Sequence, residues 1–189
     1  MSVLAESDVQ PFAVLDSSAL VPRRARIRLQ RLALVGEHLY TPFWSEWIIA
    51  ETWRVLTERW FRLLPAGAVP DLPRLRRDAN EMMRHLLPVM RLVTLRGYSG
   101  PAPWPGLTDV NDYPIWHTAV VAGAQYVVSQ NTHHFPPLVD GRHVYEGVEY
   151  VTVVKFIEDV LGATVAEHGD PLPAGVSLRS GRRHRGESL

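Results

Sequence analysis

Phe12-Ala-Val-Leu-Asp16-Ser-Ser-Ala-Leu20 is the stretch that decides the fold of this 189-residue chain. An apolar run ends in an acid and passes into a polar turn, a pattern typical of a buried strand of a parallel sheet. Open α/β sheets bind their ligands at the carboxyl ends of the strands, so Asp16 is a candidate site residue. The simpler interpretation of Asp16 is a helix N-cap, which Asp and Ser supply routinely.

The rest of the chain repeats this alternation of strand-like and helix-like segments. The pattern predicts strands over residues 12–16, 38–42, 91–95, 125–129 and 149–153. It predicts helices over residues 24–35, 45–64, 72–89, 114–122 and 154–161. Strands that alternate with helices indicate a largely parallel sheet covered by helices, which is the α/β class.

A second acid, Glu51, falls inside the helix predicted to begin at Ser45. It lies amid Trp47, Ile48 and Trp53. A carboxylate among apolar residues is costly unless it is paired or binds a metal, and this favours a functional role. An ion pair with a neighbouring arginine is the ordinary alternative.

Two further acids, Asp109 and Asp112, precede a helix that Pro114 opens. Negative charge is stabilised at a helix N-terminus, so capping explains one of them, but two exceed what one cap needs. A polar patch, Ser129-Gln-Asn-Thr-His-His-Phe135, follows the next apolar strand. If the first and fourth strands are neighbours, these acids and this patch converge on one crevice. Several acids in one crevice suit a hard cation such as Mg²⁺, which prefers oxygen ligands.

Composition sets broad limits on the class of protein. Hydrophobic residues make up 46% of the chain, enough for one well-buried domain, and nothing asks for a second. The absence of cysteine excludes disulfides and thiolate zinc sites. No segment has the pattern of a signal peptide or a membrane span, so we expect a cytoplasmic protein without a membrane partner.

Basic residues are unevenly distributed, although the net charge is zero. All but Lys155 of the 20 are arginine, and five of them lie between Arg23 and Arg31. Arginine binds phosphate through its planar fork, so this segment is a candidate contact for RNA or for an acidic protein partner. The residues of this segment assigned to that contact are Arg23, Arg24 and Arg28. A merely solvated helix face is the alternative.

Three segments together resemble a PIN domain: residues 14–20, 45–56 and 109–131. Order, spacing and flanking residues match, and the resemblance extends from about Phe12 to Leu161. It is closest to PIN proteins of toxin–antitoxin pairs, similar in kind to VapC. The resemblance implies a three-layer α/β/α sandwich with a central, mostly parallel sheet. It also implies a Mg²⁺- or Mn²⁺-dependent ribonuclease toxin that acts on RNA, forms a homodimer and is neutralised by a cognate antitoxin protein.

The resemblance also assigns roles to individual residues. Asp16, Glu51 and Asp112 match the catalytic, metal-binding acids, and Asp109 matches an additional metal ligand that many members have. The place of a fourth acid holds Ser129 and Asn131. In a related branch an Asp-Phe pair follows, and here it is His134-Phe135. Auxiliary or substrate-binding roles therefore go to Ser17, Ser129, Asn131 and His134. A neutral Asn131 predicts weak affinity for a second metal.

The chain divides into an N-terminal extension (residues 1–10), a PIN-like domain (11–165) and an Arg-rich tail (166–189). The tail carries proline, glycine, serine and arginine without periodicity, so we expect it to be disordered. Two other functions compete with the ribonuclease. One is a PIN-like module with a weakened site that binds RNA or a partner protein without cleavage. The other is a phosphatase of a different α/β fold, in which Ser18 would occupy the second position of an Asp-x-Asp motif; it ranks last.

Overall fold

The computed structural model describes residues 10–34, 39–95, 107, 112–164 and 172–173. These residues form a seven-stranded sheet in the order β3-β2-β1-β4-β7-β6-β5. Five strands run parallel: β1 (Phe12–Leu15), β2 (Thr41–Ser45), β3 (Arg91–Val93), β4 (Tyr126–Val128) and β7 (Val148–Val151). β5 (Leu138–Val139) and β6 (Arg142–Tyr145) extend one edge in antiparallel fashion.

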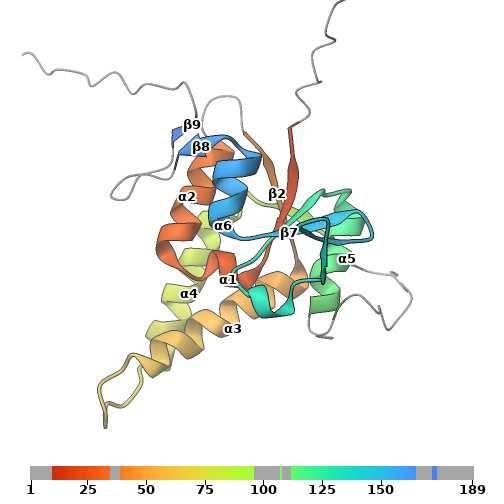
Figure 1. The fold of residues 1–189 in the computed structure, drawn as a ribbon. Coiled ribbons are helices and arrows are strands. Elements are labelled where there is room, and N and C mark those ends of the chain that lie inside the picture. Colours follow the sequence, from red (N-terminus) through yellow and green to blue (C-terminus); the bar gives the residue numbers. More distant parts are fainter. Residues whose placement is uncertain (1–9, 35–38, 96–106, 108–111, 165–171, 174–189) are drawn as a thin grey trace, which may run out of the picture.

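Helices cover both faces of the sheet, as Figure 1 shows. One face carries α2 (Arg23–Leu34) and α6 (Val153–Lys155), which continues as a π-helical turn, η3 (Phe156–Val160). The other face carries α5 (Tyr113–Ala122). The predicted three-layer α/β/α sandwich with a mostly parallel sheet is therefore confirmed. A short α1 (Ser17–Leu20) and a 3-10 turn, η2 (Thr132–His134), follow β1 and β4 at the carboxyl edge of the sheet.

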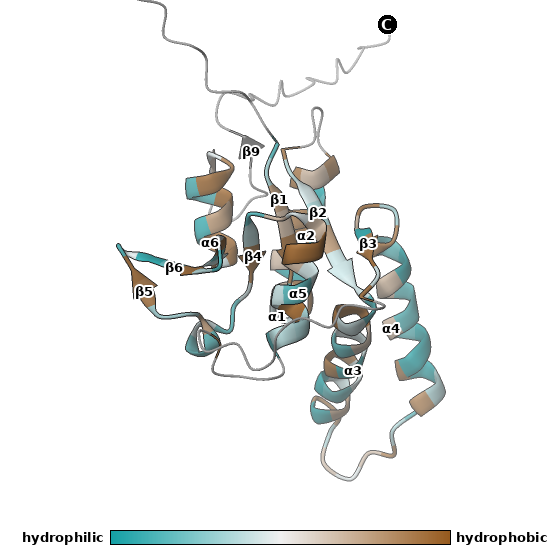
Figure 2. Cartoon of the chain, turned by 90° about the vertical axis from the view of Figure 1, so that its right-hand side faces the viewer, coloured by the Kyte–Doolittle hydropathy of each residue, from teal (hydrophilic) through white to brown (hydrophobic). Residues whose placement is uncertain are grey.

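Two long helices, α3 (Glu46–Arg62) and α4 (Leu72–Leu86), lie side by side and project beyond the sheet (Figures 1 and 2). α4 begins as predicted: the Asp71 side chain accepts from the Arg74 amide, and Pro73 occupies its first turn. Far along the chain, Ala163–Thr164 (β8) pairs with Leu172–Pro173 (β9). Within the described residues, no helix is both long and apolar enough to span a membrane.

The core lies on both faces of the central strands. Trp44, Tyr40 and Phe156 are among its largest fully buried side chains. The Tyr40 ring meets Phe156 edge-on at 5.1 Å, and its hydroxyl donates to the Leu29 carbonyl at 2.9 Å. This buried hydroxyl is therefore satisfied, as a buried polar group should be.

The second strand lies at Thr41–Ser45, so the prediction of residues 38–42 was displaced. Pro42 lacks an N–H, and proline is normally excluded from central strands. Successive N–H groups of a strand point to opposite sides, and Thr41 donates toward β1, to the Pro11 carbonyl. Position 42 therefore faces β3, which begins only opposite Phe43. No ladder bond is lost there, so the strand tolerates Pro42.

In the antiparallel meander β5–β6–β7, the strands β5 and β6 were missed from the sequence, whereas β7 was predicted at residues 149–153. Its two turns are Asp140-Gly141 and Glu146-Gly147, and all four residues have positive φ between 48° and 80°. An Asp-Gly pair between apolar residues is a strong hairpin signal, because both central residues of the tight turn need positive φ. This signal was present in the sequence and could have identified the hairpin.

Candidate active site

The Asp16 carboxylate is the buried centre of the site. It follows β1 directly, with only 4% of the residue exposed. Its Oδ2 accepts from the hydroxyls of Ser18 at 2.5 Å and Ser129 at 2.8 Å, and its Oδ1 accepts from Ser17 at 3.3 Å. Asp16 also caps α1 through the Ser18 amide at 3.4 Å. The capping interpretation is therefore correct but incomplete, since three hydroxyls also donate hydrogen bonds to this carboxylate.

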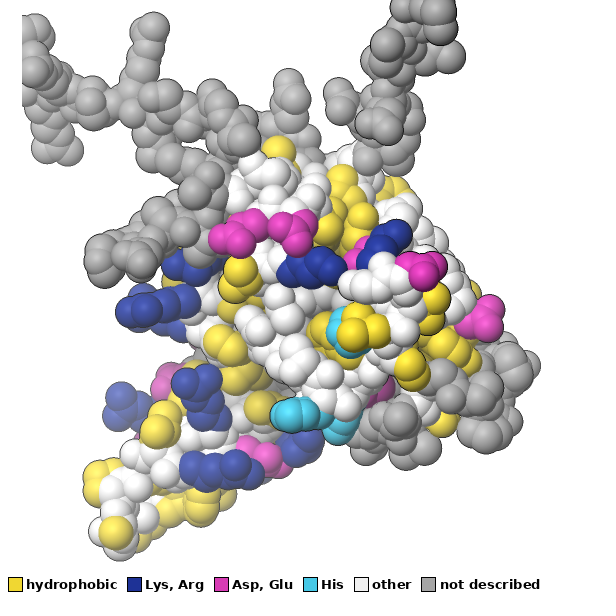
Figure 3. Space-filling model, viewed as in Figure 1, with side chains coloured by type: hydrophobic (Ala, Val, Ile, Leu, Met, Phe, Trp, Pro, Cys, Tyr) yellow, Lys and Arg dark blue, Asp and Glu magenta, His cyan; other side chains and the backbone are white. Residues whose placement is uncertain are grey.

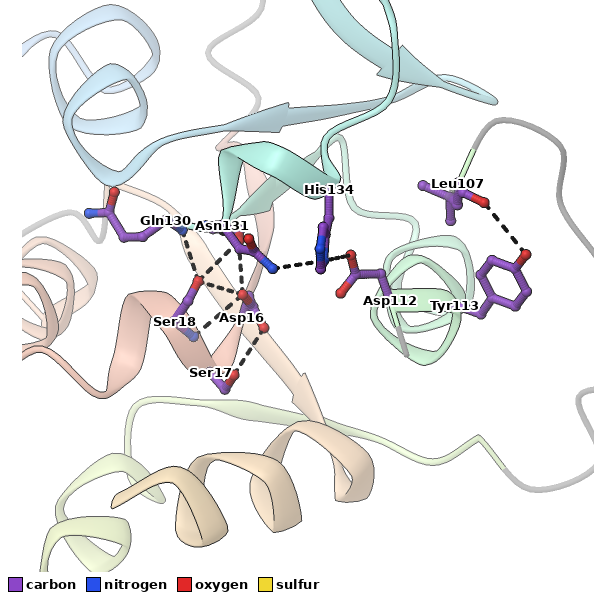
Figure 4. Close-up of polar contacts among 10 residues, drawn as sticks. Asp16, Ser17, Ser18, Leu107, Asp112, Tyr113, Gln130, Asn131 and His134 are labelled. Atoms are coloured by element: carbon purple, nitrogen blue, oxygen red, sulfur yellow. Dashed lines mark hydrogen bonds and ion pairs between the residues drawn. The ribbon is translucent and has the colours of Figure 1, made fainter. Parts of the chain in front are cut away.

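Ser18 and Ser129 are themselves fixed by backbone groups, and Figure 4 shows Ser18 between Asp16 and Gln130. The Gln130 amide donates to the Ser18 hydroxyl at 2.8 Å, and the Asn131 amide donates to the Ser129 hydroxyl at 3.0 Å. Each hydroxyl thus accepts from the chain after β4 and donates to Asp16. β1 and β4 are neighbours in the sheet, which is the condition under which Asp16 and the polar patch after β4 were expected to converge. This network fixes the orientation of the Asp16 carboxylate before any ligand binds.

Asp112 lies at the N-cap position of α5, but its side chain makes no capping hydrogen bond. Its Oδ2 lies 3.3 Å from His134 Nδ1, and the same nitrogen lies 2.9 Å from the Asn131 amide nitrogen. Nδ1 can accept from Asn131 when it carries no proton, or donate to Asp112 when it does. Figure 4 shows His134 between Asn131 and Asp112. The Asp112 side chain is therefore directed to the polar patch after β4 and does not cap its helix.

Glu51 projects from α3 toward the same region. Its carboxylate lies 4.0 Å from the Arg54 guanidinium, whereas Arg54 lies 2.7 Å from Glu58. The Arg54 side chain is 57% exposed, and ion pairs of this kind contribute little. The ordinary ion-pair alternative is thus present only as a long contact.

Two adjoining cavities bring the predicted acids together. A small one, with room for about 10 Å³, is lined by Asp16, Asp112, Ser129, Asn131, His134 and Tyr150, together with apolar side chains. A wider one of about 650 Å³ is lined by Glu51, Asp112, Asn131, His134, Trp47, Ala50 and Arg54. Asp112, Asn131 and His134 belong to both. The predicted convergence of Asp16, Asp112 and the polar patch after β4 is therefore correct, whereas Glu51 lines only the wider cavity.

The donor set is rich in oxygen and suits a hard divalent cation. Asp16, Glu51 and Asp112 supply carboxylates, and Asn131 adds an amide oxygen. Within the described residues, however, no three His, Asp or Glu side chains are gathered tightly enough to hold a metal ion as they stand. Asp109, the predicted additional ligand, lies outside the described residues.

The arginines proposed for RNA or antitoxin contact lie apart from both cavities. Arg23 and Arg24 are exposed on α2, and Arg28 is half-buried there. Figure 3 shows basic side chains gathered over α2 and the arm that α3 and α4 form. Arg26, between them in sequence, donates to the carbonyls of Leu20 and Val21, and burial lowers its guanidinium pKa. Arg26 therefore stabilises the α1–α2 junction.

Sequence reasoning missed three side chains that line the cavities. Trp47 and Arg54 are four residues before and three after Glu51, so helical spacing alone places them on its face. Tyr150, on β7, had no signal of comparable strength, because a tyrosine in an apolar strand is usually core. Burial and the negative charges of Asp112 and Asp16 raise the pKa of the Tyr150 hydroxyl.

No protein-family model and no curated protein sequence matches the chain. Among solved structures, it is similar to VapBC2 from Rickettsia felis bound to a promoter DNA fragment, with 12% identity and a TM-score of 0.43. That match covers 75% of this chain and 98% of the other. It is also similar to Mycobacterium tuberculosis VapC20, a toxin that cleaves the Sarcin-Ricin loop, with 16% identity and a TM-score of 0.36. This second match covers 61% of this chain and 86% of the other. At these identities and TM-scores the function must be argued from the site.

Proposed function

We propose that this protein is a divalent-metal-dependent ribonuclease of the PIN type, in which Asp16, Glu51 and Asp112 hold Mg²⁺ or Mn²⁺. The observation that carries the proposal is the convergence of acids from three distant segments on two adjoining cavities at the carboxyl edge of the sheet. The sequence resemblance assigns catalysis to the same three acids. Asp109 is proposed as a further ligand.

A bound divalent cation would lower the pKa of a water molecule and stabilise the negative charge that develops on the phosphodiester. The protein's part is to hold carboxylates in place for that ion. Ser17, Ser18 and Ser129 orient Asp16, so little reorganisation is needed on binding. Arg54, exposed beside Glu51 in the wider cavity, offers a planar fork to a substrate phosphate. Asn131 and His134 line both cavities and would contact water or phosphate oxygens.

In this proposal the protein is a cytoplasmic toxin that cleaves RNA, acts as a homodimer and is held inactive by an antitoxin protein. Arg23, Arg24 and Arg28 are the proposed contacts for RNA or antitoxin on α2. Their distance from the acidic cavities suits a role in binding rather than in chemistry.

The test is metal-dependent cleavage of structured RNAs by the wild type and by Asp16→Asn, with Mg²⁺ or Mn²⁺ present. We expect Asp16→Asn to reduce cleavage to background, because the amide removes the buried negative charge. Asp71→Asn is the matched control, since Asp71 caps α4 far from the cavities and accepts from the Arg74 amide at 3.0 Å. Equal cleavage by the wild type and Asp16→Asn would sink the mechanism.

A weakened module that binds RNA or a protein without cleavage is the second candidate. It is favoured by Asn131 and His134, which occupy places where the PIN pattern carries acids, and by the lack of a tight three-ligand cluster among the described residues. Calorimetric titration with Mn²⁺ separates the two functions. The ribonuclease requires Mn²⁺ binding that Asp16→Asn abolishes, whereas the module requires none.

A further inference from the structure

Tyr150 is a buried residue of the core that also lines the acidic site. It lies in β7, opposite Val127 of β4 and His143 of β6, and only 3% of it is exposed. Its ring packs edge-on against Phe135 at 5.7 Å. The side chain lines the same small cavity as Asp16 and Asp112. A tyrosine from the core thus lines the cavity that both carboxylates line.

The Tyr150 hydroxyl is buried, and no described residue makes a hydrogen bond with it. A hydroxyl buried without a partner is unfavourable, and buried polar groups in proteins are normally satisfied by protein or by ordered water. The chain solves this problem elsewhere, because the equally buried Tyr40 donates to a backbone carbonyl. Phenylalanine would fill the apolar part of the Tyr150 position without this cost. The hydroxyl therefore needs an explanation beyond packing.

The small cavity supplies a fitting partner. Its volume of about 10 Å³ is close to the space that one water molecule requires. Its polar lining includes the Tyr150 hydroxyl as a donor and the Asp16 and Asp112 carboxylates as acceptors. A single water can accept from the Tyr150 hydroxyl and donate to both carboxylates, so it would satisfy the hydroxyl and link it to Asp16 and Asp112.

We propose that Tyr150 is a positioning residue of the acidic site, whose hydroxyl donates to one water molecule that in turn donates to Asp16 and Asp112. The water fixes the two carboxylates relative to each other, as the serine hydroxyls fix the orientation of Asp16. This inference rests on the proposed function, which assigns both carboxylates to metal binding. Groups that orient metal ligands commonly change metal affinity by about 10- to 100-fold when removed.

The test is Tyr150→Phe in the full-length protein, with Mn²⁺ as the probe. Calorimetry should show a Mn²⁺ Kd raised about tenfold. Tyr40→Phe is the matched control, because it removes a buried hydroxyl with a direct backbone partner, remote from the cavities. Tyr40→Phe should lower the Tm of the metal-free protein and leave the Mn²⁺ Kd within about twofold. Tyr150→Phe should lower the metal-free Tm less than Tyr40→Phe does.

Three results would overturn the inference. A Mn²⁺ Kd of Tyr150→Phe within twofold of a measurable wild-type Kd refutes the positioning role and leaves the proposed function standing. A metal-free Tm lowered as much as in Tyr40→Phe makes the hydroxyl structural. A wild type that binds no Mn²⁺ refutes the proposed function, and the inference with it.

Discussion

Ser129→Ala removes a single hydroxyl, yet it should lower both the free energy of unfolding and the Mn²⁺ affinity of the site. The Ser129 hydroxyl donates to the Asp16 carboxylate at 2.8 Å and accepts from the Asn131 amide at 3.0 Å. Asp16 and Ser129 are both buried, so water cannot easily replace the hydroxyl that the carboxylate loses. The same hydroxyl also holds the loop after β4 against the end of β1.

The two lost hydrogen bonds give the magnitude. A hydrogen bond to a charged group contributes about 1.5–3 kcal/mol, and a neutral one about 1 kcal/mol. Ser18 still donates to the same carboxylate oxygen at 2.5 Å, which offsets part of the loss. We therefore expect the free energy of unfolding to fall by about 2–3 kcal/mol. Misplacement of Asp16 should also raise the Mn²⁺ Kd by about tenfold.

Ser45→Ala is the matched control, because Ser45 is fully buried at the end of the neighbouring strand β2. Its hydroxyl accepts from the neutral Thr118 hydroxyl at 2.9 Å, so its loss should cost only about 1 kcal/mol. Urea unfolding of both variants, and of each combined with Asp16→Asn, measures the difference. The loss of unfolding free energy caused by Ser129→Ala should be about 1–2 kcal/mol smaller in the Asp16→Asn background than in the wild type. The loss caused by Ser45→Ala should be the same in both backgrounds. Equal costs for the two serines, with no coupling to Asp16, would refute the reasoning.

Two further predictions concern stability away from the site. Glu149, 8% exposed, bonds to Arg142 and Lys155, and the hydrogen bond from Arg142 is the main cause of its lowered pKa. A lowered carboxyl pKa stabilises the fold above the usual value of 4.5, and this contribution is lost as pH falls through the folded-state pKa. Glu149→Gln should therefore cost about 1–3 kcal/mol at pH 7, and chemical unfolding below pH 4.5 should show the difference from wild type shrinking. Gly123→Ala should lower the free energy of unfolding, measured by thermal unfolding, by about 1 kcal/mol. Gly123 ends α5 at φ 64° with open space where a Cβ would lie, so only backbone strain opposes the change.

Strong local patterns determined what the sequence could predict of the fold. Helices α2 to α5 were placed within a few residues, because amphipathic spacing, Asp71 and Gly123 mark their faces and ends. β2 was displaced because Pro42 argues against a central strand, and only the late start of β3 makes it tolerable. The position at which β3 begins depends on how the sheet assembles, so it cannot be predicted from the residues near Pro42.

The same distinction holds for the site: features marked by local patterns could be predicted, and contacts between distant segments could not. The placement of the acids could be predicted, because Asp16 follows a recognisable strand, Glu51 lies inside a helix and Asp112 precedes one, whereas their metal-binding role stays a prediction. The role of Ser18 was missed, because its contacts with Asp16, Ser129 and the Gln130 amide depend on the pairing of β1 with β4. Tyr150 was missed for the same reason: strand alternation predicts its burial, but only the packed sheet shows that its hydroxyl reaches a polar cavity.

His134 offers the sharpest test of how many negative charges the site needs. Its Nδ1 lies 3.3 Å from Asp112 Oδ2, in the place where a related branch of the PIN family carries an acid. Mg²⁺ prefers oxygen ligands, whereas Mn²⁺ accepts imidazole more readily, so the natural site should favour Mn²⁺. His134→Asp adds a carboxylate beside Asp112. It should increase Mg²⁺ affinity and reduce the preference for Mn²⁺, as calorimetry with each ion would measure.

The same variant should be less stable without metal. Two carboxylates would then face each other in a site where the His134 side chain is 37% exposed, so screened repulsion should cost about 0.5–1 kcal/mol. His133→Asp is the control, because it adds the same charge one residue away at an exposed position that lines neither cavity with the acids. If both variants change the Mg²⁺ Kd equally, overall charge explains the effect and His134 holds no special place. If only His134→Asp changes the Mg²⁺ Kd, position 134 is where the site lacks the acid of the related PIN branch. The histidine there then accounts for the preference for Mn²⁺.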